Sequence, residues 1–130
     1  ERPNGSLHSL ALPVSGTVTQ TAGWRRHVAH GFWYYEPGIE LAADDPTVVA
    51  VLPGSVARIA AASAPHDGHV VVLDHGDGLL TEYKPLREVY VMPGQYVSAK
   101  APVGRADESL VFSAYLNGES LDTEALLARD

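Results

Sequence analysis

The chain has 130 residues, a formal net charge of −7 and no cysteine. A single domain of this length buries about two thirds of its extended surface, and the absence of cysteine excludes disulfides and thiolate metal sites. The nine basic residues are scattered, which disfavours nucleic-acid binding, because a phosphate-tracking groove needs a basic patch. No apolar run approaches the roughly 20 residues of a membrane span, so we expect any membrane anchor to lie upstream of Glu1.

Residues 1–13 are expected to form a leader segment, and residues 14–130 a single domain. The first strand is predicted at residues 14–20, where apolar and polar side chains alternate. Gly23 then predicts a turn, and the residues that follow it are rich in Arg and His. The aromatic run from Phe32 to Tyr35 has high strand propensity, with Trp33 and Tyr35 on the face opposite Phe32 and Tyr34.

The rest of the chain alternates short apolar runs with Gly or Pro. Only the segment that begins at Asp122, a suitable N-cap, has a helical pattern. These patterns predict a mainly β, antiparallel domain with one short C-terminal helix. The predicted elements are a turn at 44–46, a strand at 55–60, a hairpin of 70–75 with 79–83, strands at 89–91 and 95–97, a strand at 110–116 and a tight turn at 117–118.

The segment from Gly23 to Leu41 contains an Arg- and His-rich stretch, an aromatic run and two carboxylates, Glu36 and Glu40. It resembles the opening motif of the lysostaphin-type (LytM, M23) zinc peptidases, which reads Gly-Trp/Tyr-Arg-x-His-Pro, then Gly, then His-x-Gly-Ile-Asp. In that comparison Glu36 stands where the family has a zinc-binding His, and Glu40 where it has a zinc-binding Asp. The positions that fit the motif are Gly23, Trp24, Arg25, His27, Gly31, Gly38 and Ile39.

The resemblance continues over nearly the whole chain. Residues 70–83 are similar to the central hairpin of the family, and Gly94-Gln95-Tyr96-Val97 to its Gly-Gln-x-Val element. It therefore implies the antiparallel LytM/M23-like fold, known as the duplicated hybrid motif. His75 stands where the family carries a His that is not a ligand, and we expect it to make a surface hydrogen bond.

The last strand resembles the family's His-Leu-His-Phe-Glu motif with its polar groups replaced. Alignment on Phe112 places Ser109 and Val111 at the two His positions and Ser113 at the Glu position, while Pro85 takes the place of a further assisting His. Valine has no lone pair to donate to a metal. The resemblance thus implies that the zinc cofactor is lost, with degenerate catalytic positions at Pro85 and Ser109 and degenerate ligand positions at Glu36, Glu40 and Val111.

Several readings of the first motif stay open. Glu36 and Glu40 are solvated carboxylates at a turn, an acidic recognition spot or a residual metal site. The aromatic side chains belong to the core and to the lining of a cleft, or else form a platform for sugars. A candidate binding surface comprises Trp24, Arg25, Trp33, Tyr35, Glu36 and Glu40.

The resemblance implies a catalytically inactive M23 peptidase-like domain that acts as a protein–protein interaction module in the bacterial cell envelope. Its partner would be an envelope protein or peptidoglycan, and its location extracytoplasmic, with a membrane anchor in the full-length protein. Two classes of such domains are the sporulation Q proteins, which we favour, and the division-associated activators of cell-wall amidases. The alternatives are an active zinc metalloendopeptidase with atypical ligands and a peptidoglycan-binding module.

Overall fold

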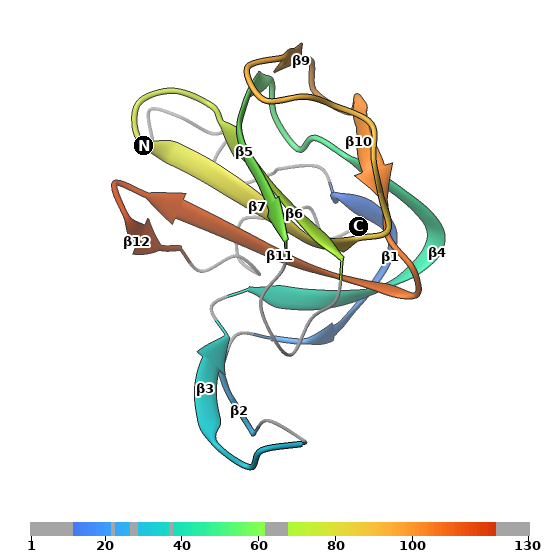
Figure 1. Cartoon of the computed structure of the whole chain (residues 1–130), viewed down its shortest axis with the longest axis vertical. Coiled ribbons are helices and arrows are strands. Elements are labelled where there is room, and N and C mark those ends of the chain that lie inside the picture. Colours follow the sequence, from blue (N-terminus) through green and yellow to red (C-terminus); the bar gives the residue numbers. More distant parts are fainter. Residues whose placement is uncertain (1–11, 22, 27–28, 37, 62–67, 122–130) are drawn as a thin grey trace, which may run out of the picture.

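Strands make up most of the part of the chain that the computed structural model describes, which is residues 12–21, 23–26, 29–36, 38–61 and 68–121. Ten of the strands form one antiparallel sheet with the order β8-β10-β4-β11-β7-β6-β5-β9, in which β1 also pairs with β4 and β12 with β11 (Figure 1). The strands are β1 (Val14–Gln20), β2 (Gly23–Arg26), β3 (Trp33–Glu36), β4 (Ile39–Val49), β5 (Gly54–Ala61), β6 (His69–Asp74), β7 (Leu79–Leu86), β8 (Glu88–Val89), β9 (Tyr96–Val97), β10 (Pro102–Arg105), β11 (Ser109–Leu116) and β12 (Glu119–Ser120).

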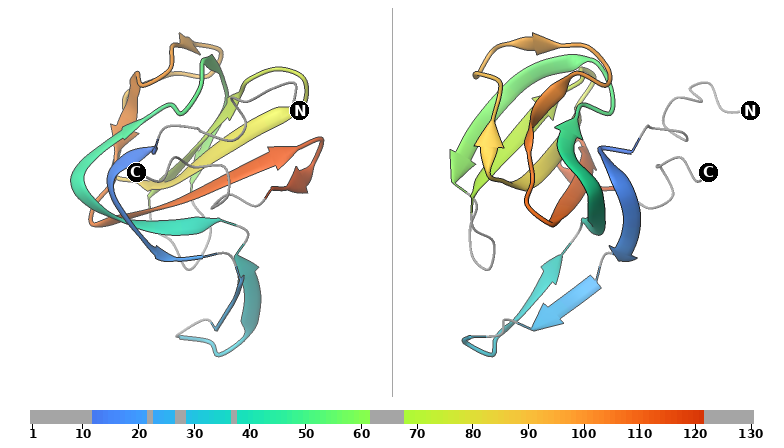
Figure 2. Two further views of the ribbon diagram at one scale, coloured as in Figure 1. Left: turned by 180° about the vertical axis from the view of Figure 1, so that it is seen from behind. Right: turned by 90° about the vertical axis from the view of Figure 1, so that its right-hand side faces the viewer.

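Strands β2 and β3 pair only with each other and form a separate two-stranded ribbon. The large sheet is strongly curved, and the ribbon projects from one end of it (Figure 2). The two sheets are joined directly, because β3 ends at Glu36 and β4 begins at Ile39. The segment that resembles the first zinc motif therefore crosses from the ribbon into the large sheet.

The core lies on one face of the large sheet. Successive side chains of a strand point to opposite faces, so Leu110 and Phe112 of β11 turn inward while Val111 and Ser113 take the other face. The rings of Phe112 and Tyr83 are 5.3 Å apart between centroids. The largest fully buried side chains are Tyr83, Phe112, Ile39, Leu41, Leu73, Leu86, Leu110, Val14, Val48, Val71 and Val103.

The turn chemistry read from the sequence is confirmed at two hairpins. Asn117 and Gly118 have φ values of 52° and 88°, as a type I′ turn requires, and they connect β11 to β12. Between β6 and β7, the run Gly76-Asp77-Gly78 has φ values of 92°, 56° and 84°. Glycine tolerates these left-handed conformations, and Asp does so better than most residues.

The turn predicted at residues 44–46 is wrong, because β4 continues through it. The pairing of β4 with β1 jumps from Val48 opposite Val14 to Asp45 opposite Ser15. Pro46 falls in this irregularity, where it does not have to donate a ladder hydrogen bond, and the Asp45 carboxylate accepts a hydrogen bond from the amide of Thr47 at 3.0 Å. The residues expected to form a turn, 44–46, therefore lie at a bulge within β4.

Strand β2 is a second departure from the prediction, since Gly23 was expected to open a turn. Instead Gly23–Arg26 pairs with Trp33–Glu36 along the whole ribbon. Cross-strand aromatic contacts favour this pairing, and the rings of Trp24 and Tyr35 meet edge to face with centroids 5.4 Å apart. The partner of the aromatic run was not visible in the sequence of β2 alone.

The described residues contain no helix. The helix predicted from Asp122 lies outside the described residues, as do residues 1–11 of the predicted leader. Within the described part of the chain, no helix has the length and apolar character needed to cross a bilayer. The division into a leader and one domain stays a prediction.

Candidate functional site

Three neighbouring strands bring together two of the positions that sequence analysis singled out. Val111 of β11 lies opposite Glu40 of β4 on one side and opposite Lys84 of β7 on the other. Cross-strand partners share a face of the sheet and lie about 5 Å apart, so these residues form a row on the face opposite the core. We call it the Glu40–Val111–Lys84 row.

The row has a mixed chemical character. Val111 is only 6% exposed, and Glu40 is half-buried. The ammonium of Lys84 lies 3.8 Å from the Glu82 carboxylate, and both side chains are 17% exposed. Glu82 in turn lies opposite Ser113. The hydrocarbon side chain of Val111 therefore lies between the Glu40 carboxylate and the ion pair of Lys84 with Glu82.

Gly38 and Ser113 lie against each other at the edge of this row. A Cβ atom at Gly38 would collide with the hydroxyl of Ser113 and would lie 2.6 Å from the carbonyl oxygen of Phe112 and 2.9 Å from Val111 Cγ1. The hydroxyl of Ser113 is buried and has no hydrogen-bond partner among the described residues. Gly38 thus packs tightly against Ser113, the residue that the family resemblance aligns with a Glu.

The other singled-out positions are more dispersed. Ser109 lies opposite Ala42, toward the start of β11. Pro85 follows Lys84 in β7 through a cis peptide bond. Glu36 ends β3, where its backbone pairs with Gly23; its side chain and His27 lie outside the described part.

The described residues at these positions do not complete a catalytic zinc site. Such a site needs three nitrogen, sulfur or carboxylate ligands and an open position for water. The Glu40–Val111–Lys84 row offers one carboxylate, Val111 offers no donor atom, and the Lys84 ammonium, paired with Glu82, is not a ligand. Among the described residues, no group of three or more His, Cys, Asp or Glu side chains is placed to hold a metal.

The candidate binding surface separates into two places. The register of the ribbon pairs Trp24 with Tyr35 and Arg26 with Trp33, and these four side chains share one face. Arg25 pairs with Tyr34 and takes the other face. Glu40 lies in the large sheet. The expectation that Trp33 and Tyr35 share a face is confirmed, but both are more than half exposed, at 64% and 51%, and belong to no core.

His75 has a more elaborate role than the expected surface hydrogen bond. Its Nδ1 lies 2.8 Å from the carbonyl oxygen of Pro53, and its Nε2 lies 2.7 Å from the hydroxyl of Thr81. Since a carbonyl only accepts, Nδ1 carries the proton, and in the neutral ring Nε2 accepts from Thr81. Burial lowers the pKa of His75, against opposing contributions from the Pro53 carbonyl and the Asp74 carboxylate.

The chain of hydrogen bonds continues into the core. The hydroxyls of Thr81 and Tyr83 are 2.8 Å apart, and the amide of Val51 donates to the Tyr83 oxygen at 3.2 Å. Burial raises the pKa of Tyr83 to about 12, although its hydrogen bonds with Thr81 and Val51 oppose the shift. Sequence reasoning missed this connection, because the partners of His75 come from β7 and from the segment before β5.

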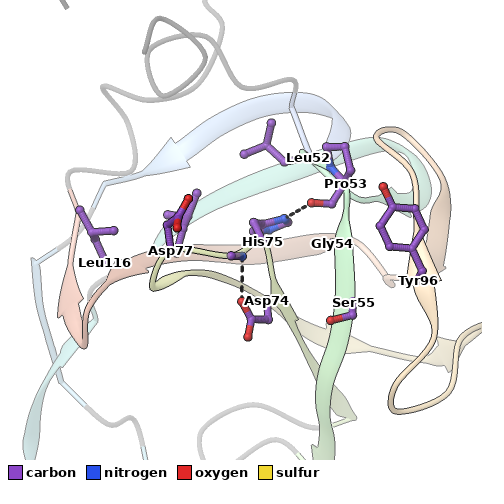
Figure 3. A pocket seen from close by; sticks show the side chains of 11 residues that line it. Leu52, Pro53, Gly54, Ser55, Asp74, His75, Asp77, Tyr96 and Leu116 are labelled. Atoms are coloured by element: carbon purple, nitrogen blue, oxygen red, sulfur yellow. Dashed lines mark hydrogen bonds between the residues drawn. The ribbon is translucent and has the colours of Figure 1, made fainter. Parts of the chain in front are cut away.

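A pocket of about 730 Å³ opens beside His75, between the β6–β7 turn, the start of β5 and β9 (Figure 3). The carboxylates of Asp74 and Asp77 lie on it, and Asp74 accepts a hydrogen bond from the amide of Gly76 at 2.9 Å. Apolar walls come from the side chains of Leu52, Leu79, Leu116 and Tyr96. It is separate from the Glu40–Val111–Lys84 row, and sequence analysis had not singled it out.

Comparisons with solved structures agree with this fold. A chain from the SpoIIQ–SpoIIIAH pore-forming complex superposes with a TM-score of 0.79 at 22% identity, covering 94% of this chain and 92% of that one. Csd3 of Helicobacter pylori gives a TM-score of 0.75 at 19% identity, covering 96% of this chain and 38% of Csd3. For the solution structure of lysostaphin, the values are 0.60 and 19%, covering 91% of this chain and 51% of that one.

At these identities the structural likeness shows the fold alone. None of the curated protein sequences matches the chain. The sequence profile of Peptidase family M23 matches residues 34–124, which run from the aromatic ribbon past the last strand. Because this match covers most of the chain, and because the curved antiparallel sheet agrees with it, the chain belongs to peptidase family M23.

Proposed function

We propose that this chain is an M23 domain that holds no catalytic zinc and serves as a protein-binding module in the bacterial cell envelope. The Glu40–Val111–Lys84 row carries the proposal. Zinc would need a third ligand where Val111 presents a methyl group. Without the ion, neither a metal-activated water nor a polarised carbonyl is available for peptide hydrolysis.

A protein partner is supported by the similarity to SpoIIQ, which is found in a complex with SpoIIIAH. A fold that has lost hydrolysis keeps its exposed surfaces and strand edges, which suit recognition by β-augmentation or by aromatic contacts. The proposal places the domain outside the cytoplasm, attached through an anchor upstream of Glu1, as in a sporulation Q-type protein.

Zinc content tests the loss of catalysis directly. Protein purified without chelator and dialysed against zinc is expected to bind no stoichiometric ion and to release no fragments from purified cell walls. Lysostaphin, handled in the same way, serves as the positive control. One tightly bound zinc per chain, together with cell-wall hydrolysis, would establish the active-peptidase alternative instead.

The aromatic ribbon favours a second candidate, a peptidoglycan-binding module. Trp24, Trp33 and Tyr35 are exposed on one face, as sugar-stacking platforms are. Co-sedimentation with purified peptidoglycan decides between the candidates, and we expect the chain to stay in the supernatant. If a Glu36→Ala and Glu40→Ala double variant still binds the protein partner as well as the wild type does, the acidic spot is not part of the interface.

A further inference from the structure

The β2–β3 ribbon carries an uncovered aromatic face. Trp24, Trp33 and Tyr35 lie on it beside Arg26, and the two tryptophans are 65% and 64% exposed. A two-stranded ribbon is marginally stable in water without packing against another surface, and clustered exposed aromatic side chains are typical of binding sites. We call these four residues the aromatic face.

The ribbon ends at Glu36, whose side chain lies outside the described part, and its described side chains are basic in an acidic protein. Arg26 Nε donates to the carbonyl oxygen of Gly31 at 3.1 Å, and Arg25 donates to the carbonyl oxygens of Thr21 and Trp24. Backbone carbonyls carry no net charge, so these bonds leave both positive charges in place. The whole chain has a net charge of −7. A surface that complements the aromatic face must be apolar and acidic.

The pocket beside His75 has that character. Asp74 and Asp77 are its charged side chains, Leu52, Leu79 and Leu116 are among its apolar ones, and no Lys or Arg is among the described residues that line it. Its volume of about 730 Å³ lies in the range that encloses ligand-sized groups. Strand β9, which contributes Tyr96 to the pocket, and the ribbon lie at opposite ends of the molecule (Figure 1).

We propose that the aromatic face of one copy of this chain docks into the His75 pocket of a second copy. The tryptophan rings would enter between the leucine side chains, and Arg26 would meet Asp74 and Asp77. Because the two surfaces differ and lie at opposite ends, the contact is heterologous and joins copies head to tail. The inference stands apart from the proposed function, since it uses neither zinc nor the Glu40–Val111–Lys84 row.

The size of the contact sets its expected strength. Three aromatic side chains bury about 150–250 Å² each, or about 450–750 Å² together. This total is below the roughly 800 Å² per partner of a standard stable interface. Association is therefore expected to be reversible and to grow with protein concentration. Tethering of the chains near one another, for example on a common surface, would raise their effective concentration and favour the contact.

Sedimentation velocity over a series of protein concentrations tests the inference. The average mass of the wild type is expected to rise above that of one chain as concentration increases. Arg26→Glu on the ribbon and Asp74→Asn with Asp77→Asn in the pocket should each abolish the rise. The matched controls change the same charges elsewhere on the surface, with Arg58→Glu for the ribbon and Asp44→Asn with Glu108→Gln for the pocket, and they should associate like the wild type.

A mixing experiment separates head-to-tail docking from other contacts. The ribbon variant keeps a working pocket and the pocket variant keeps a working ribbon, so a mixture of the two should form a dimer with one chain of each and nothing larger. Circular dichroism of each variant confirms that its fold is kept. A wild type that stays monomeric at every concentration, a ribbon or pocket variant that still associates, or a mixture without the mixed dimer would each overturn the inference.

Discussion

Glu40 of β4 and Val111 of β11 are direct cross-strand partners, so a carboxylate and an isopropyl group lie side by side at two positions where the family resemblance predicts degenerate metal ligands. Lys84 completes the row from the other side. The backbone arrangement therefore brings the positions together, and the side chains decide what they can do. The predictions below separate the contribution of the side chains from that of the backbone.

Restoring the ligands of the family should restore metal binding. A variant with Glu36→His, Glu40→Asp and Val111→His is expected to bind zinc with one ion per chain, measured by isothermal titration and elemental analysis. The matched control keeps Val111 and changes only the two Glu positions, and it should bind far more weakly, because it lacks the third ligand. Equal zinc binding by both variants would show that Val111 does not limit the site.

Replacing Gly38 by Ala should destabilise the fold. The new methyl group would lie 2.6 Å from the carbonyl oxygen of Phe112 and would collide with the Ser113 hydroxyl, and such overpacking typically costs about 1–3 kcal/mol. Urea unfolding measures the loss, with the exposed Ser120→Ala as a control that stays within about 0.5 kcal/mol of the wild type. Adding Ser113→Ala should recover only part of the loss, since the backbone contact with Phe112 remains.

Ser113→Ala alone should leave the protein as stable as the wild type or more so. The buried hydroxyl has no hydrogen-bond partner among the described residues, and removing such a group relieves a desolvation cost of about 1–3 kcal/mol. The thermal midpoint is the measurement, and Ser109→Ala, at a half-buried position of the same strand, is the comparison. A clear fall in the midpoint of Ser113→Ala would mean that the hydroxyl has a partner in solution.

The free energy of unfolding should decrease as the pH is lowered below 6.5, because of His75. Burial lowers the pKa of His75 below its ordinary value of 6.5 in the folded chain, so the unfolded chain takes up the proton first. The stabilisation is therefore complete above pH 6.5 and is lost as the pH falls from there through the lower pKa of the folded state. Unfolding free energies across this interval should decline for the wild type and stay flatter for His75→Gln.

The His75→Gln variant should also be less stable at neutral pH. It disturbs the bonds to the Pro53 carbonyl and the Thr81 hydroxyl, and each buried group left without a partner costs about 1–3 kcal/mol. His69→Gln, at an exposed position of β6, is the control. An identical pH dependence in wild type and His75→Gln would assign the effect to other groups.

Local patterns in the sequence predicted most of the strands because each depends on neighbouring residues. The alternation at residues 14–20 fits β1, and Asn117-Gly118 specifies a turn whose two positive φ values suit few other residue pairs. The turn predicted at residues 44–46 failed for the converse reason. Asp45 and Pro46 are compatible with a turn or with a bulge, and only the pairing of β4 with β1 decides between them.

By itself, the sequence determined the residue types: it established that Val111 has no electron pair for a metal, that the order of motifs is that of the M23 family and that the chain is acidic. The tertiary structure alone decided which of these residues meet. Lys84 beside Val111, Gly38 against Ser113 and His75 bonded to Pro53 all depend on segments distant in sequence. The physical reason is that sheet registers are set by long-range pairing and burial, which no local pattern encodes.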